Sequence, residues 1–172
     1  LRFSIEFETP QNIAMRQFAG LILNQQDLPQ SDSLRVYVCG SASPLGRSDQ
    51  AQSCLAVVTP QHFYIVDSGA GAAANVARAS LPMNRLRGVF LTHFHSDHIG
   101  EIYEMNLASW IQGRPEPLRI FGPKGVKQIV RGINETYEQD RGYRVEHHGS
   151  ELLPPELGKL VHKSIKEGVV LE

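Results

Sequence analysis

The sequence of 172 residues contains only two cysteines, one tryptophan and no apolar run that approaches the ~20 residues of a membrane-spanning helix. It also lacks a charge imbalance, because 17 Lys and Arg nearly cancel 18 Asp and Glu to leave a net charge of −1. This balance provides no broad electrostatic field for nucleic acid or an anionic membrane, although a local basic groove stays compatible with it. The chain begins at Leu1 rather than Met, so a preceding signal peptide is left open and neither a cytoplasmic nor a periplasmic localisation is predicted.

The two cysteines, Cys39 and Cys54, form neither a C-x-x-C pair nor a zinc-finger spacing. Both lie in or beside segments that we expect to form strands. We therefore predict two small buried hydrophobic side chains rather than a disulfide.

Hydrophobic patterning divides the chain into an N-terminal extension, residues 1–33, and a domain, residues 34–172. In the extension, alternation over residues 1–8 predicts a half-buried strand, and residues 11–25 place apolar side chains on one helical stripe. We expect this extension to pack on the domain or on a second chain, which leaves a homodimer open. Beyond residue 33 strands alternate with helices, as is typical of an α/β layered domain.

Five short apolar segments of this domain predict strands. They are residues 34–39, 54–59, 63–66, 88–91 and 118–121. Helices are expected from the glycine-rich turn at Asp67 to about Pro82, and from Ile99 to Trp110. The spacing of apolar residues from Val126 to Tyr137 predicts a third helix, which we expect Gly142 to end. No regular element is predicted after it.

Directly after the strand at 88–91 stands Thr92-His93-Phe94-His95-Ser96-Asp97-His98. Imidazole and carboxylate groups suit Zn²⁺ and similar ions. A solvated loop or a core histidine would explain one histidine, but not four potential ligands behind an apolar strand. A bend there would turn His93 and His95 toward one metal and Asp97 and His98 toward a second. The strand ending at Asp67 would bring a carboxylate that accepts a hydrogen bond from a ligand histidine or from loop backbone, or that caps its own turn.

The pattern Thr92-His93-x-His95-x-Asp97-His98-x-Gly100 resembles the signature of the metallo-β-lactamase superfamily, and Val66–Gly69 is similar to the first motif of that fold. Gly40–Val58 and Leu118–Pro123 are similar to its ribonuclease Z and arylsulfatase-like branch. The resemblance covers about residues 36–142. It implies an α/β fold, the αββα sandwich, of which this chain holds mainly the N-terminal half.

The resemblance also implies two divalent metal ions, most simply Zn²⁺, with His93 and His95 on the first and Asp97 and His98 on the second. A later His, a bridging Asp and a last His complete the family's site. The later histidines of this chain do not fit that pattern, so the remaining ligands are expected beyond residue 172. They are His147, His148 and His162.

Bound Zn²⁺ lowers the pKa of water toward ~7, so the leading hypothesis is a hydrolase that uses hydroxide on a phosphodiester or sulfate ester, in RNA or in a small ester. Asp97 is expected to bind metal, and a catalytic role in orienting the nucleophile or accepting its proton is equally compatible.

Four readings of the function stay open. Gly100-Glu101-Ile102 departs from the Gly-Leu-Pro type of ribonuclease Z, and no long basic glycine-rich arm is visible, which favours a small ester over transfer-RNA 3′ processing. A thioester hydrolase or lactonase and a non-catalytic scaffold of the same fold are the alternatives.

Overall fold

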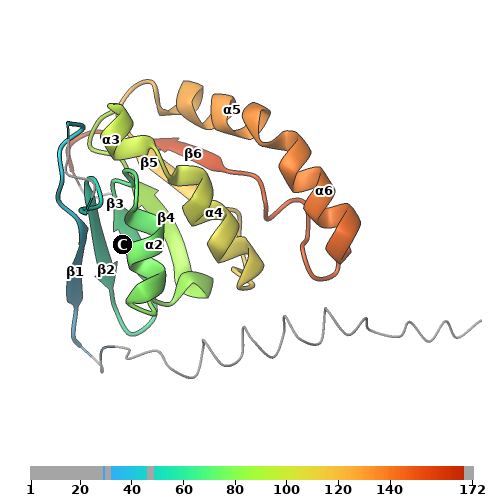
Figure 1. Ribbon diagram of the computed structural model, residues 1–172, viewed down its shortest axis with the longest axis horizontal. Helices are drawn as coiled ribbons and strands as arrows, with labels where there is room; N and C mark the ends of the chain where they lie inside the picture. Colours follow the sequence, from blue (N-terminus) through green and yellow to red (C-terminus); the bar gives the residue numbers. More distant parts are fainter. Residues whose placement is uncertain (1–28, 30–31, 46–48, 169–172) are drawn as a thin grey trace, which may run out of the picture.

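The computed structural model describes residues 29, 32–45 and 49–168, which build one six-stranded sheet with helices against it (Figure 1). The strands are adjacent in chain order: β1 (Arg35–Gly40), β2 (Cys54–Val58), β3 (Phe63–Val66), β4 (Leu86–Phe90), β5 (Arg119–Gly122) and β6 (Val161–Ser164). β1, β2 and β3 pair in antiparallel fashion, whereas β3, β4, β5 and β6 pair in parallel. The predicted α/β class is confirmed.

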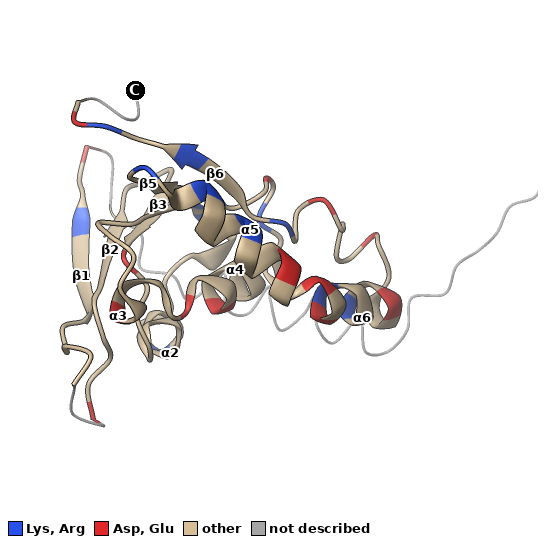
Figure 2. Cartoon of the chain, turned by 90° about the horizontal axis from the view of Figure 1, so that it is seen from above, with Lys and Arg blue, Asp and Glu red and all other residues tan. Residues whose placement is uncertain are grey.

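Helices connect the parallel strands, as parallel pairing requires. They are α2 (Ala72–Arg78), α3 (Ser96–Ile99), α4 (Ile102–Ile111), α5 (Val126–Thr136) and α6 (Glu138–His148), with a 3₁₀ turn at Met83–Arg85. All of them lie on one side of the sheet in both views (Figures 1 and 2). Because β3 to β6 run in the same direction, their carboxyl ends lie at one edge of the sheet, where α/β folds place their functional loops.

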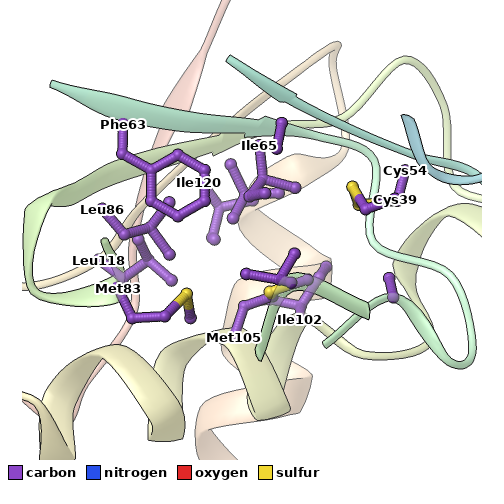
Figure 3. Packing of buried hydrophobic residues seen from close by; sticks show 14 of the residues in the cluster. Cys39, Cys54, Phe63, Ile65, Met83, Leu86, Ile102, Met105, Leu118 and Ile120 are labelled. Carbon is purple, nitrogen blue, oxygen red and sulfur yellow. A yellow bond between two sulfur atoms is a disulfide. The ribbon is translucent and has the colours of Figure 1, made fainter. Parts of the chain in front are cut away.

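The main core lies between the sheet and these helices (Figure 3). Alternate strand residues such as Ala56, Ile65 and Ile120 are completely buried, and Ile102 and Met105 of α4 pack onto them. Full burial of such an aliphatic side chain contributes roughly 1.5–3 kcal/mol. The inward-facing residues of the strands and the buried residues of α4 thus pack together in one core.

The opposite face of the sheet is also apolar, although no described helix covers it (Figure 2). Val36 and Val38 of β1 are 56% and 69% exposed. Farther along the same face, the rings of Tyr64, Phe90 and Phe121 follow one another with centroid distances of 5.7 and 4.4 Å. A sheet that is apolar on both faces is typical of a layered sandwich, and this agrees with the expected αββα arrangement.

Both predicted helices after the metal run are interrupted. Tyr137 (φ −103°, ψ 17°) separates α5 from α6, so the prediction that Gly142 ends the helix is wrong: Gly142 lies inside α6. The break brings Tyr137 onto the ring of Tyr103, with 3.6 Å between ring centroids, while the Tyr103 hydroxyl donates to Asp140 at 2.6 Å. Burial and the Asp140 carboxylate raise the pKa of Tyr103, so this hydroxyl stays a donor at neutral pH.

The C-terminal part is more regular than the sequence predicted. His147 and His148 end α6, and His162 lies in β6, whose residues are all exposed. A polar edge strand carries no alternation, and its backbone pairing with β5 alone defines it. The predicted strand and helix of the extension lie outside the described residues, and among the described helices none is long and apolar enough to cross a membrane.

Cys39 and Cys54 are joined by a disulfide, so the prediction of two separate buried thiols is wrong. Antiparallel pairing of β1 with β2 brings their Cα atoms to 5.0 Å, within the range that a disulfide spans. The sulfur atoms border the core (Figure 3). A spacing of 15 residues could not reveal this contact, because the pairing of the two strands creates it.

We expect the double variant Cys39→Ser, Cys54→Ser to lose about 3 kcal/mol of unfolding free energy, since a loop of this length is no longer closed in the unfolded chain. Denaturant unfolding of both proteins without reductant measures the difference. Two titratable thiols in the unreduced, denatured wild type would contradict the disulfide.

Candidate metal centre

Asp67 stands at the end of β3 and connects it to the loop after β4. Its backbone adopts a positive φ of 58°, which few residues other than glycine take up and which Asp tolerates better than most. The Asp67 amide donates to Phe90 O at 2.8 Å, and this turn directs the carboxylate at the metal run. The Thr92 amide donates to Oδ1 at 2.9 Å, the Thr92 hydroxyl to Oδ2 at 2.8 Å, and His98 Nδ1 lies 2.7 Å from Oδ2. Asp67 therefore accepts from both a histidine and loop backbone, as predicted.

This carboxylate sets the tautomers of two imidazoles. A carboxylate only accepts, so His98 Nδ1 carries the proton and His98 Nε2 keeps a free lone pair. The Thr92 hydroxyl gives its single proton to Asp67, so it accepts from His93 Nδ1, which lies 3.0 Å away. In a neutral imidazole this leaves the lone pair on His93 Nε2. Outer hydrogen bonds of this kind orient the histidines of metal sites.

The nitrogen and oxygen atoms of the run that could bind a metal lie in two pairs. His93 Nε2 is 3.1 Å from His95 Nδ1, and His98 Nε2 is 3.5 Å from Asp97 Oδ2. The rings of His93 and His98 are themselves close, with 4.0 Å between centroids, so the two pairs are neighbours. The structure thus brings together all four residues singled out in the sequence.

Asp97 lies in the first turn of α3 and is only 6% exposed. Its Oδ1 is buried and accepts no hydrogen bond from the described residues. Burying a carboxylate without a donor or a cation is costly, so this atom fits a cation. Close packing positions the helix: a Cβ on Gly69 would collide with the Asp97 carbonyl oxygen, which explains the glycine of the motif.

The later histidines stay apart from the run. His147 and His148 contact one another at the end of α6, and His162, on β6, is paired with Ile120 of β5. Within the described part of the chain no three His, Cys, Asp or Glu side chains converge on one point. Among the described residues, the candidate ligands of the run therefore lie together only in pairs.

A parallel sheet whose edge carries a histidine-rich loop and a supporting carboxylate defines an α/β domain with a candidate metal centre. Residues 47–163 match the family model of the metallo-β-lactamase superfamily, which is more than half of the chain, and the chain belongs to that superfamily. Its members generally bind divalent metals.

The named relatives narrow the branch. A ribonuclease Z from Mycobacterium bovis is 33% identical over 125 residues, which are 71% of this chain and 45% of the relative. The chain thus spans about half the length of the curated relatives that it matches. This likeness supports the predicted ribonuclease Z side of the branch and a metallo-hydrolase.

Solved structures agree on the fold. A metallo-β-lactamase-fold protein from Bacillus subtilis aligns with a TM-score of 0.57 and 17% identity, covering 78% of this chain and 48% of that one. The short form of human tRNase Z aligns with a TM-score of 0.54 and 20% identity, over 60% and 40% of the two chains. The predicted metallo-β-lactamase fold is confirmed.

Sequence reasoning assigned no role to Thr92, although a hydroxyl residue directly before the first histidine was a usable signal. We expect Thr92→Val to weaken zinc binding by the full-length protein about 10- to 100-fold, because the proton on His93 Nδ1 loses its acceptor. Thr92→Ser keeps the hydroxyl and serves as the control. Competition with a chromophoric chelator measures the affinity, and equal affinities for Thr92→Val and wild type would contradict the relay from Asp67.

Proposed function

We propose that this chain provides one half of a dinuclear zinc centre in a hydrolase that cleaves phosphodiesters. The observation that carries the proposal is the pairing of donor atoms: His93 with His95, and Asp97 with His98. Tetrahedral Zn²⁺ with bonds of about 2.0–2.1 Å separates two ligand atoms by roughly 3.3 Å. The separations of 3.1 and 3.5 Å fit that geometry closely.

His93 and His95 would bind the first ion, and Asp97 and His98 the second. Divalent ions there would supply Lewis-acid chemistry and lower the pKa of water. Asp67 and Thr92 keep the Nε2 lone pairs of His98 and His93 available and fix the planes of both rings. A role for the Asp97 carboxylate in orienting the nucleophile or accepting its proton is compatible with this ligand role.

The donor set favours zinc over magnesium or calcium, because three of the four groups are imidazoles and hard cations prefer oxygen. The buried Oδ1 of Asp97 adds negative charge where a cation would compensate it. A non-catalytic scaffold of the same fold would have no need of an intact donor set supported by Asp67.

The relatives named ribonuclease Z favour a phosphodiester over the sulfate ester, thioester and lactone alternatives. Processing of transfer RNA at its 3′ end is the narrower candidate within this proposal. Along α5 and α6, basic and acidic residues are intermixed (Figure 2), and the net charge of the chain is −1. The surface of α5 and α6 has no extended run of basic residues that would bind a long RNA, so a small phosphodiester stays an alternative substrate.

The test compares His98→Ala with His147→Ala in the full-length protein. His98→Ala removes a proposed ligand, the imidazole that Asp67 orients. We therefore expect the variant to bind one metal equivalent less and to hydrolyse a bis-aryl phosphate at least ~100-fold more slowly. His147 is exposed at the end of α6, and its loss is expected to change neither quantity. Elemental analysis and initial rates are the measurements.

A panel of a bis-aryl phosphate, an aryl sulfate, a thioester, a lactone and a precursor transfer RNA then identifies the substrate class. Turnover confined to the sulfate, thioester or lactone would overturn the phosphodiester proposal. A wild-type protein purified without chelator that contains no transition metal would favour the scaffold instead.

A further inference from the structure

Glu101, three residues after the last histidine of the run, grips the start of a different helix. Its Oε1 accepts from the Gly71 amide at 2.6 Å and its Oε2 from the Ala73 amide at 2.8 Å. The Glu101 amide also donates to Ser68 O at 2.8 Å. One residue of the metal loop therefore contacts the turn after β3 at three points.

The turn that Glu101 grips is the one that carries Asp67. It begins at Asp67, contains Ser68 and Gly71, and leads into α2. The Ser68 amide donates to His98 O at 2.7 Å, which adds a fourth link between the turn and the metal loop. The separation between Asp67 and His98 thus depends on contacts made on both sides of that pair.

The Gly71 and Ala73 amides, which donate to Glu101, receive no other side-chain acceptor from the described residues. Gly71 precedes the first turn of α2 with φ 84°, and α2 has no side-chain cap within its own segment. The amides at a helix start lack intrahelical acceptors, and negative charge is favourable there. The Glu101 carboxylate provides both an acceptor and a negative charge at this helix start. The Glu101 amide donates to Ser68 rather than continuing α3, which explains why α3 and α4 are separate helices.

We propose that Glu101 is a positioning residue for the Asp97 and His98 half of the metal centre. By fixing the turn against α3, its carboxylate keeps Asp67 at hydrogen-bond distance from His98 and keeps His98 Nε2 beside Asp97. The inference rests on the proposed metal centre. It also gives a physical meaning to the departure from Gly-Leu-Pro after the run, since a leucine at this position accepts no hydrogen bond.

Glu101→Gln tests the grip with almost no change in volume. The amide has one acceptor oxygen, and its NH₂ group faces a backbone N–H, so one of the two contacts is lost. We expect the full-length variant, titrated with Co²⁺ and followed by visible absorbance, to show about tenfold weaker binding in one of two steps. The other step, at His93 and His95, is expected to stay close to wild type.

Two controls separate positioning from general stability. Glu104→Gln alters an exposed glutamate in the first turn of α4, the helix that Glu101 precedes, and is expected to leave both steps unchanged. Val130→Ala removes buried volume from α5 and lowers the melting temperature, but it is expected to leave cobalt binding unchanged. A drop in affinity seen for Glu101→Gln and absent from Val130→Ala would support the proposal.

Two outcomes would overturn it. If Glu101→Gln melts at a lower temperature but binds cobalt as wild type does, Glu101 only caps α2, and the metal centre itself is unaffected. If the wild-type protein binds no cobalt, the metal centre fails and this proposal with it. The wild-type titration thus distinguishes failure of the proposed function from failure of the Glu101 proposal alone.

Discussion

The carboxylate of Asp67 is the contact on which the arrangement of the site depends. It joins the end of β3 to the loop after β4 through Thr92 and His98, and it is almost completely buried. Hydrogen bonds are stronger in such an environment, and a buried carboxylate without donors would be costly. Three donors satisfy it, and two imidazoles are oriented as a consequence. A residue that stabilises its own turn therefore also prepares the donor atoms for metal.

Much of the fold was predictable where a segment is both apolar and central. β3 and β4 are short apolar runs bounded by turn residues, and the structure has strands there. β6 was not predictable, because an exposed polar edge strand is defined only by the strand beside it. The disulfide and the break at Tyr137 have the same origin. Each depends on a partner that is distant in the sequence, Cys54 on Cys39 and Tyr137 on Tyr103.

The metal run was identifiable because its residue types are chemically distinctive, and the structure places its four side chains together. Their role as ligands stays a prediction. The supporting residues carried less signal, since Thr92 and Glu101 are common residue types. Their partners lie 25 and 30 positions earlier in the chain, in the turn that begins at Asp67. Only the three-dimensional pairing of β3 with β4 brings that turn to the run, so the place of Thr92 directly before His93 was the one local signal, and Glu101 had none.

The described chain leaves two things incomplete, the set of metal ligands and the cover of the sheet. Each pair of donor atoms would supply two ligands, whereas a zinc ion in a protein takes three or four. The sheet likewise has one face covered by helices and one largely apolar face that no described helix covers. In an αββα sandwich a second layer would cover that face, and it could bring further ligands to the edge where Asp67 and the run stand. Because metal binding is coupled to folding when a site is assembled from separate parts, we expect packing on the open face and metal affinity to depend on one another.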